Sequence, residues 1–322
     1  MRLPVQAFWQ TSEEDAKMSA PRNPLVSVVI PTRGRPETLE RCVRSIFESS
    51  YKPLEVVVVD DFSDEDSTRS LLQLYPQLKV VRNEKRMLLA ASRNAGVSKT
   101  NGEMIFFVDD DNVVASDAIA QLVSCATSES AGVIAPLIYY ASEPEKIWYA
   151  GSWMSPISAV SVFPYRGRSD VRLEKPYATS LFHDAFMVSR SVFETIGMFD
   201  QKRFPIYLSE ADYAERMRKR NLSVMVNPKA HVWHDVPVLR GTQNLLRHVH
   251  ITEPSRAYYV ARNRIVFMRM YRGVMQNLIF LAFFVPAFGA LHLASILSSK
   301  HAAKVYFARY YLGGIIAGLR MR

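Results

Sequence analysis

Three consecutive carboxylates follow directly after an apolar run in this chain. Residues 105–112 read IFFVDDDN, so Asp109, Asp110 and Asp111 come after four apolar residues that are typical of a buried strand. Adjacent carboxylates repel one another and raise each other's pKa, so packing alone does not favour such a cluster. A divalent cation does favour it, because Mg²⁺ and Mn²⁺ prefer oxygen ligands. The motif therefore predicts a metal site at the end of a strand.

Polar residues also close two earlier apolar runs. LVSVVIPT (25–32) ends in Pro31-Thr32, and the apolar part of LEVVVVDDFSDED (54–66) ends in Asp60-Asp61. The expected elements are strands at 25–32, 54–66, 78–83, 104–112 and 131–140 and helices at 36–49, 67–75 and 90–100. This alternation is typical of a mostly parallel sheet with helices on both faces. Ligands bind beyond the carboxyl ends of such strands, so the three polar ends are expected to share one crevice.

Five segments, in this order, resemble a family 2 glycosyltransferase with the GT-A fold. They are VSVVIPTRGRPETLERCVRSI, EVVVVDDFSDED, SRNAGV, FFVDDDN and AFMVSRSVFETIGMFDQKRFPIYLSEADYAERMRKR, and the similarity covers about residues 25–235. The resemblance implies an α/β domain at 25–240, with a nucleotide-sugar half (25–115) and an acceptor half (130–240), after a flexible segment at 1–24. The chain has no G-x-G-x-x-G or P-loop motif, which counts against a dehydrogenase or an NTPase.

The resemblance also implies a binding site for a nucleoside diphosphate sugar. In it, Asp61 meets the base with the help of Asp60, and Arg93 lies near the diphosphate. Asp111 is the principal ligand of Mg²⁺ or Mn²⁺, and the two preceding acids meet ribose or metal. The expected nucleotide-sugar residues are Pro31, Thr32, Arg35, Asp60, Asp61, Arg93, Asp109 and Asp110, and the expected metal ligands are Asp111, Asp109 and His234. A cation held there neutralises charge on the leaving diphosphate.

The acceptor half contains carboxylates that could act as a base. In YLSEADYAERMRKR (207–220), Glu210 aligns with the family's usual base and Asp212 with a second acid, while Ser209 replaces the first acid of the family pattern. The base takes the acceptor's proton as the acceptor oxygen attacks the anomeric carbon, and a single displacement of this kind inverts the configuration. Asp212 has a second interpretation, an ion pair with Arg216 one helical turn along.

Other residues have both a functional and a structural interpretation. His234, in AHVWHD (230–235), aligns with a histidine that reaches the metal or the diphosphate in many GT-A enzymes, but it could also be a packed histidine. Asp184 lies where the family often has glycine, and it is expected to hydrogen-bond an acceptor hydroxyl. Trp148 and Trp153 could stack on a sugar or belong to the core.

The C-terminal region, 254–322, carries the excess of positive charge. It has ten Lys or Arg residues and no Asp or Glu, whereas the rest of the chain holds 30 basic and 31 acidic residues. Its uncharged run, about 273–299, is long enough to span a bilayer and has basic residues on both sides. Pro286 could break this helix, so a re-entrant or interfacial hairpin is favoured over a straight span, and a buried core helix is the third alternative. This pattern favours a membrane surface over nucleic acid as the anionic partner.

Together these features predict an inverting, metal-dependent glycosyltransferase at the cytoplasmic face of the cell membrane, anchored by its C-terminal region. The expected acceptor is a lipid-linked saccharide in the synthesis of a surface polysaccharide or a glycoprotein glycan. One alternative is a polyprenyl-phosphate sugar synthase, whose acceptor is already anionic, and another is a catalytically silent membrane scaffold. Cys42 and Cys125 form no C-x-x-C motif, which fits a reducing compartment and counts against disulfides or a zinc site.

Overall fold

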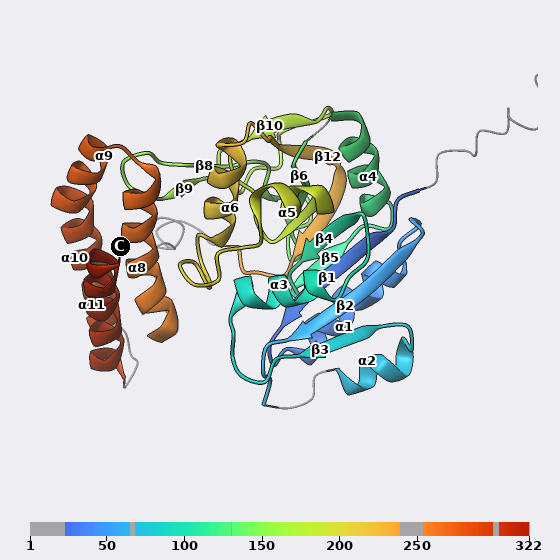
Figure 1. The fold of residues 1–322 in the computed structure, drawn as a ribbon, viewed down its shortest axis with the longest axis horizontal. Helices are drawn as coiled ribbons and strands as arrows, with labels where there is room; N and C mark the ends of the chain where they lie inside the picture. Colours follow the sequence, from blue (N-terminus) through green and yellow to red (C-terminus); the bar gives the residue numbers. More distant parts are fainter. Residues whose placement is uncertain (1–22, 65–67, 130, 239–253, 299–302, 322) are drawn as a thin grey trace, which may run out of the picture.

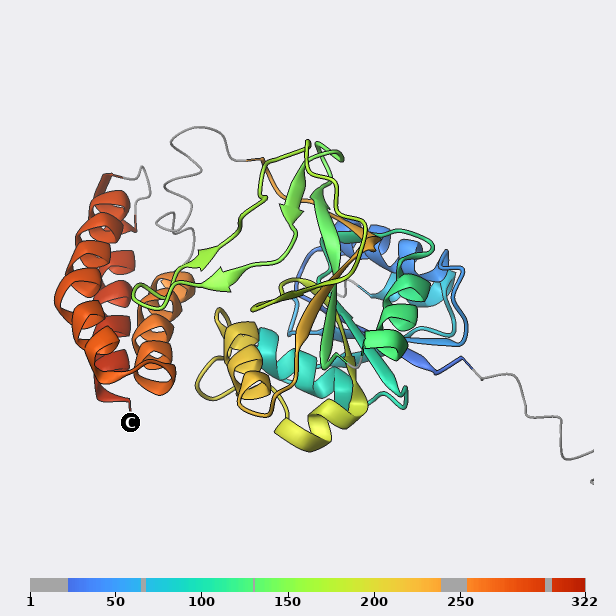
Figure 2. The same ribbon diagram turned by 90° about the horizontal axis from the view of Figure 1, so that it is seen from above.

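The structure is a computed structural model of the 322-residue chain, and it describes residues 23–64, 68–129, 131–238, 254–298 and 303–321. The segment 1–24, which is predicted to be flexible, lies outside these residues except for its last two. Figure 1 and Figure 2 show a central sheet with helices on both of its faces and, beside it, a bundle of long C-terminal helices. The molecule thus has two structural parts.

The N-terminal half of the sheet follows the predicted alternation of strands and helices. Its parallel strands lie side by side in the order β4-β1-β2-β3. The bounds are β1 Val26–Thr32, α1 Pro36–Phe47, β2 Leu54–Asp60, α2 Arg69–Leu74, β3 Lys79–Arg82, α3 Leu89–Ser98 and β4 Met104–Val108. β1 is buried along its whole length, as its continuous apolar run predicts. β2 ends at Asp60 instead of 66, because the chain turns there and the backbone N–H of Ser63 donates to the Asp60 carboxylate.

The other half of the sheet is only partly parallel. β11 (Ala185–Ser189) runs antiparallel between β4 and β6 (Val133–Tyr140), and β12 (Val224–His234) runs parallel to β6. The remaining elements are β5 Asn112–Val114, α4 Ala118–Glu129, β7 Ile147–Tyr149, β8 Trp153–Met154, β9 Ser161–Val162, β10 Tyr177–Thr179, α5 Arg190–Ile196 and α6 Ser209–Arg218. Both halves of the chain therefore contribute to one 10-stranded sheet, and the prediction of a mostly parallel α/β sheet is confirmed.

An aromatic cluster joins the sheet to the helices on one face. The ring of Phe107 in β4 lies 5.0 Å from that of Phe186 in β11 and 5.6 Å from that of Phe199. The ring of Phe199 in turn lies 4.5 Å from that of Tyr213 in α6. Burial of such rings is a large part of the apolar energy of a core, and their contacts fix relative position. The cluster therefore sets α6, which carries Glu210, against the strand that carries the acidic motif.

The C-terminal helices pack side by side, as both views of the ribbon show (Figure 1, Figure 2). They are α8 Pro254–Tyr271, α9 Val274–Ile279, a π-helical turn at Phe280–Phe284, α10 Val285–Ser298 and α11 Lys304–Arg320. The expectation that Pro286 breaks the apolar helix is wrong, because helical backbone continues from Val274 to Ser298. A π-helical turn, Phe280–Phe284, lies just before Pro286. Its wider backbone makes room for the proline ring and changes the hydrogen-bond pattern where proline cannot donate.

The helix Val274–Ser298 is long and apolar enough to cross a membrane, by length and composition. Its mean hydropathy over the most apolar window is 2.1, and only 22% of that window is buried inside the protein. A core helix of a globular protein would be mostly buried. The low burial therefore counts against the core-helix alternative.

α8 and α11 approach each other closely at two glycines of α11. A Cβ atom at Gly314 would lie 2.3 Å from the carbonyl oxygen of Tyr258, and one at Gly318 would lie 2.9 Å from that of Arg262. Glycine at these positions lets the two backbones touch. Arg269 then donates through Nη1 to three carbonyl oxygens at the end of α11, at 2.8 to 3.2 Å. The contacts follow the same order along both helices, so α8 and α11 are parallel.

Candidate functional site

The carboxyl ends of β1 and β4 meet at the acidic motif. Pro31 and Thr32 are the last residues of β1, and Thr32 Oγ1 donates to Asp110 Oδ2 at 2.6 Å. Arg35 also pairs with Asp110 and donates through Nη1 to Asp111 Oδ2 at 2.7 Å. Four predicted nucleotide-sugar residues and the predicted principal metal ligand are thus brought together at one edge of the sheet.

Two neighbouring carboxylates of the motif have very different pKa values. Burial raises the pKa of Asp110 to about 7, although Arg35 and Thr32 act in the opposite direction. Burial also acts on Asp111, but the nearby His234 and Arg35 outweigh it and hold the pKa of Asp111 at about 2. Asp111 is therefore the acid that is ionised at neutral pH, as a metal ligand must be.

Asp111 and His234 together fit a divalent cation. His234 Nε2 lies 3.3 Å from Asp111 Oδ1, and this oxygen is buried without a hydrogen-bond partner. Two adjacent ligands of an octahedral cation, each about 2.1 Å from it, lie roughly 3.0 Å apart, which is close to this separation. Among the residues that the structure describes, no three His, Cys, Asp or Glu side chains are grouped to hold a metal. The protein would supply two ligands and leave the other positions to diphosphate and water oxygens.

Asp184 orients His234 from the other side of its ring. Asp184 Oδ2 lies 3.2 Å from His234 Nδ1, and the Trp148 ring packs edge-on against the imidazole at 4.6 Å. Burial lowers the pKa of His234, but Asp184 and Asp111 outweigh it and raise the pKa above 6.5. Asp184 has a φ of 49°, in the left-handed region, which is unusual for a residue with a side chain. The predicted bond from Asp184 to an acceptor stays a prediction.

Arg93 bridges the acidic motif and the candidate base. Its side chain is fully buried, its Nη2 pairs with Asp109 Oδ1 at 3.0 Å, and its Nη1 pairs with Glu210 Oε1. In this structure Arg93 pairs with Asp109 and Glu210, and the expected roles of Arg93 at the diphosphate and of Asp109 as a metal ligand stay predictions. A buried guanidinium needs carboxylate partners, and Asp109 is one of the two that it has.

Glu210 is ionised, and both of its oxygens have partners. Burial raises the pKa of Glu210, but the contact with Arg93 outweighs it, so the net pKa lies below the ordinary 4.5. Ser209 Oγ donates to Glu210 Oε2 at 2.8 Å. The serine that departs from the family pattern thus contacts the candidate base directly. Glu210 has the charge of a base, and Arg93 must yield part of its contact before Glu210 can take a proton.

Asp212 points away from this cluster and joins α6 to α8. Its side chain is 1% exposed, its Oδ2 accepts from Arg216 Nε at 3.0 Å, and its Oδ1 accepts from the Tyr271 hydroxyl at 2.6 Å. The ion-pair interpretation is therefore confirmed, and both oxygens are used in packing two helices together, while a catalytic role of Asp212 stays a prediction.

The turn that leads into α6 is held by α8. Tyr207 and Leu208 have φ values of 54° and 62°, which are left-handed and unfavourable for side chains of this size. Asn263 of α8 is fully buried, and its Nδ2 donates to the carbonyl oxygens of Ile206 at 2.6 Å and Tyr207 at 2.9 Å. α8 thus stabilises the strained backbone that directly precedes Glu210.

Asp60 and Asp61 lie at the same edge of the sheet and bind neighbouring loops. Asp60 Oδ1 accepts from the backbone N–H of Ser63 at 3.0 Å. Asp61 Oδ1 accepts from the N–H of Met87 at 2.7 Å, and its Oδ2 accepts from that of Leu88 at 2.8 Å. Both carboxylates hold loops at this edge of the sheet, and their contact with a nucleotide stays a prediction.

His183 is a site residue that the sequence analysis overlooked. Its Nε2 lies 3.0 Å from Ser152 Oγ, and its charge is among the influences that lower the pKa of Glu210. Its position directly before Asp184 was the signal that could have identified it. Trp148 lies in the site, 6.3 Å from the His183 ring, whereas Trp153 is 45% exposed on β8.

Solved structures resemble this fold, among them the following two. The mannosyltransferase PcManGT from Pyrobaculum calidifontis, in complex with GDP-Man and Mn²⁺, has a TM-score of 0.56 and 17% identity, over 93% of this chain and 88% of that one. GalNAc-T7 with UDP, GalNAc and Mn²⁺ has a TM-score of 0.57 and 19% identity, over 80% of this chain and 55% of that one. At these identities the likeness establishes the fold alone, which is the predicted GT-A fold.

A search of curated proteins finds relatives that are similar over part of the chain. The GalNAc(5)-diNAcBac-PP-undecaprenol beta-1,3-glucosyltransferase of Campylobacter jejuni is 32% identical over 115 residues, which are 34% of this chain and 37% of that protein. Three other relatives are matched over 25%, 32% and 42% of their lengths, so the chain spans less than half of each. The model of the family described as glycosyl transferase family 2 matches residues 27–197, more than half of the chain. The chain belongs to glycosyl transferase family 2.

Proposed function

We propose that this chain is an inverting, metal-dependent glycosyltransferase that uses a nucleoside diphosphate sugar. The observation that carries the proposal is the pair of Asp111 and His234, 3.3 Å apart, at the same acidic motif that Arg93 connects to Glu210. A cation bound there would hold the donor diphosphate and neutralise its charge as the glycosidic bond breaks. Glu210 would take the proton of the acceptor hydroxyl during a single displacement.

The proposed acceptor is a lipid-linked saccharide at the cytoplasmic face of the membrane. The exposed apolar helix Val274–Ser298 and the uniformly basic C-terminal region support membrane docking. The name of the Campylobacter jejuni relative describes a substrate carried on undecaprenyl diphosphate, which supports an acceptor of this class. An enzyme can reach a lipid-linked acceptor readily when the helix that carries its base packs against a membrane-bound bundle. Here α6, which carries Glu210, is hydrogen-bonded to α8 of the bundle.

Calorimetric titration of the full chain with UDP, GDP and dTDP, with and without Mn²⁺, tests the donor site. We expect one nucleotide to bind only with Mn²⁺, and Asp111→Asn to weaken that binding at least about 10- to 100-fold. Asp170→Asn is the matched control, because Asp170 is a carboxylate that is 69% exposed and pairs only with Arg168 among the described residues. Metal-independent binding would contradict the metal site, and no binding by folded protein would favour the scaffold alternative.

A polyprenyl-phosphate sugar synthase is the second candidate, and the contacts of Glu210 favour it. Both Glu210 oxygens already accept from Arg93 and Ser209, and an anionic phosphate acceptor needs no strong base. Glu210→Gln separates the two candidates. For a saccharide hydroxyl, we expect the turnover number to fall about 10²- to 10⁴-fold. Near-normal turnover with a lipid phosphate acceptor would identify the synthase instead.

A further inference from the structure

One face of α8 presents a stripe of three side chains to the segment that leads into α6. Asn263, Phe267 and Tyr271 are four residues apart, so they lie above one another on the helix. The Asn263 amide donates to two carbonyl oxygens in the turn before α6, and the Tyr271 hydroxyl donates to a carboxylate within α6. Between these contacts, the Phe267 ring lies 6.4 Å from that of Phe204, in the lead-in segment. The stripe therefore contacts the chain on both sides of Glu210.

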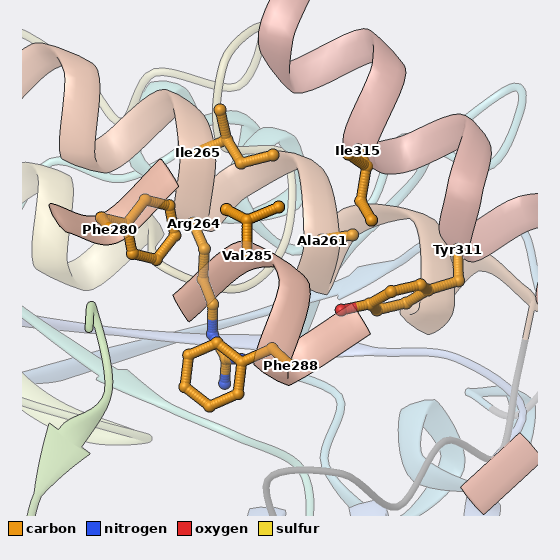
Figure 3. A pocket seen from close by; sticks show the side chains of 8 residues that line it. All are labelled: Ala261, Arg264, Ile265, Phe280, Val285, Phe288, Tyr311 and Ile315. Atoms are coloured by element: carbon orange, nitrogen blue, oxygen red, sulfur yellow. The ribbon is translucent and has the colours of Figure 1, made fainter. Parts of the chain in front are cut away.

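A different face of α8 packs against the rest of the C-terminal bundle. Figure 3 shows Ala261, Arg264 and Ile265 of α8 on that face, among side chains of α10 and α11. The Arg264 guanidinium carbon lies 4.7 Å from the ring centroid of Phe288 in α10. The bundle thus fixes α8 from one side, while the stripe faces α6 from another.

The turn that the stripe contacts lacks the usual local support at the start of a helix. Leu208 occupies the N-cap position, where Ser, Thr, Asp or Asn commonly accepts from a backbone N–H, and it makes no side-chain capping bond. It also has a φ of 62°, and Tyr207 before it has one of 54°, which are unfavourable for side chains of this size. A backbone of this kind persists only where surrounding contacts hold it.

The Asn263 side chain matches this turn with all of its hydrogen-bonding groups. It is fully buried, and its Nδ2 donates to the carbonyl oxygens of Ile206 at 2.6 Å and Tyr207 at 2.9 Å. Its Oδ1 accepts from Arg262 Nε at 2.9 Å. Two carbonyl oxygens need two donors, so an aspartate of the same shape could not make these contacts. A fully satisfied buried amide fixes the turn in one position.

The same turn is bonded to α3, the helix that carries Arg93. The backbone N–H of Ala90 in α3 donates to the carbonyl oxygen of Pro205 at 2.9 Å. The next two carbonyl oxygens along the chain accept from Asn263, so α3 and α8 hold one turn together. The pairing of Arg93 Nη1 with Glu210 therefore depends on where α8 holds this turn.

We propose that Asn263 is a positioning residue for Glu210. By fixing the turn, its amide sets the place of the Glu210 carboxylate relative to Arg93 and to the acidic motif. A displacement of about 1 Å in a reacting group can lower turnover about 100-fold, so the effect is large enough to measure. The inference rests on the proposed function, in which Glu210 is the base, and adds the residue of the C-terminal bundle that holds this base in place.

Two substitutions of Asn263 test this role in the full chain in detergent. Asn263→Asp removes both donors and keeps the shape of the side chain, and Asn263→Ala removes them without adding a charge. Ile265→Ala is the matched control, because Ile265 is 1% exposed and lies on the face of α8 that packs on the bundle.

Hydrolysis of a nucleoside diphosphate sugar measures turnover without a known acceptor. Each protein is given UDP-glucose, dTDP-glucose or GDP-mannose with Mn²⁺, and release of the nucleoside diphosphate is followed. Water replaces the acceptor hydroxyl: its oxygen bonds to the anomeric carbon, the bond from that carbon to the diphosphate breaks, and a proton of the water passes to Glu210.

We expect both Asn263 variants to lower the turnover number of hydrolysis about 10- to 100-fold. Calorimetry should give the affinity for the nucleotide and the number of sites per chain that the wild type has, which excludes a loss of folded protein. Hydrogen exchange of the Asp212 amide, which donates to the Leu208 carbonyl oxygen at 2.9 Å, should rise at least about tenfold in both variants. Ile265→Ala should leave turnover, nucleotide binding and this exchange close to those of the wild type.

The outcomes separate this inference from the proposed function. Turnover or Asp212 exchange that is unchanged in both Asn263 variants would overturn the positioning role, as would equal effects of Ile265→Ala. If Asn263→Asp does not fold, Asn263→Ala decides by the same criteria. Failure of the proposed function has a different signature, because the wild type would then bind no nucleotide with Mn²⁺. Asp212 exchange needs no donor, so it decides whether Asn263 holds the turn even where none of the three sugars is hydrolysed.

Discussion

At the scale of single residues, environment decides what a carboxylate does in this protein. Asp110 and Asp111 are neighbours, yet burial raises the pKa of one to about 7 while His234 and Arg35 hold that of the other at about 2. Asp212 and Glu210 lie in the same helical turn, and one joins helices while the other contacts Arg93. The residue type alone therefore does not identify a ligand or a base, because its partners determine its charge and its access.

Glu55 offers a test of this principle away from the candidate site. Burial raises its pKa, but bonds from Lys79, Ser27 and the Asn101 N–H outweigh it and lower the pKa from 4.5 to about 2. A lowered pKa means that the ionised form stabilises the fold above pH 4.5 and that this contribution is lost as pH falls towards 2. We expect Glu55→Gln to lower the free energy of unfolding by about 1 kcal/mol at pH 7. Between pH 4.5 and pH 2, the free energy of unfolding of this variant should fall less steeply than that of the wild type.

Denaturant unfolding at a series of pH values measures this effect. The matched control is Glu40→Gln, which changes a surface ion pair with Arg44 whose side chains are 37% and 55% exposed. Such pairs contribute about 0.5 kcal/mol or less, so this variant should follow the wild-type pH profile. A profile of Glu55→Gln parallel to that of the wild type would contradict the assignment.

At the scale of elements, glycine spacing in α11 illustrates how an intrachain contact can resemble an association motif. Gly314 and Gly318 have the small-xxx-small spacing of helix dimers, and the structure uses both against α8 of the same chain. Gly313, their neighbour, has no atom within 4 Å of the place where a Cβ would be. Gly314 is thus required by close packing against α8, whereas no packing contact requires glycine at Gly313.

This difference predicts opposite effects of two alanine substitutions. Gly314→Ala would put a Cβ 2.3 Å from the Tyr258 carbonyl oxygen, and we expect it to destabilise the bundle by about 1–3 kcal/mol. Gly313→Ala meets nothing and should stabilise the helix by about 0.5–1 kcal/mol. Thermal unfolding in detergent, followed by circular dichroism, measures both. Equal effects of the two substitutions would contradict the packing of α11 on α8.

The elements that the sequence predicted well are those whose pattern is set locally. The continuous apolar runs predicted β1, β2 and β4, and Pro36 with its helical spacing predicted α1. β11 was not predicted, because its antiparallel place between β4 and β6 is decided by distant strands. At the site, the acidic motif and His234 were predicted and lie close together, but the pairing of Arg93 with Glu210 joins residues far apart in the chain and became visible only in the fold.

At the scale of the whole molecule, the C-terminal bundle is tied to the α/β part through contacts between α8 and α6. Tyr271 and Arg272, where α8 ends, contact Asp212 and Glu215 of α6, and Asn263 holds the turn that precedes α6. Any displacement of the bundle therefore acts on the helix that carries Glu210. The two parts are coupled through buried polar contacts, which are costly to break one partner at a time.

Two arginines that share Glu215 allow this coupling to be measured. Arg272 and Glu215 are 12% and 10% exposed at their side chains, whereas Arg218, the other partner of Glu215, is 69% exposed. Arg272→Leu should cost about 3–5 kcal/mol of unfolding free energy, and Arg218→Leu less than about 1 kcal/mol. Hydrogen exchange of the α6 amides should increase only in Arg272→Leu. If both variants behaved alike, α8 would not be what secures α6.

The parallel contact between α8 and α11 has a consequence for the order in which the protein is made. Of these three helices, a ribosome releases α6 first, α8 later and α11 last. The helix with Glu210 therefore emerges before α8, which contacts it, and before α11, which packs against α8. At about 5–20 residues per second, the stretch from Glu210 to Met321 takes roughly 5 to 20 s to synthesise. During the first part of that interval, until Arg272 has been synthesised, Asp212 and Glu215 lack their partners in α8. We therefore expect a nascent chain to acquire its active geometry only after α11 has been translated.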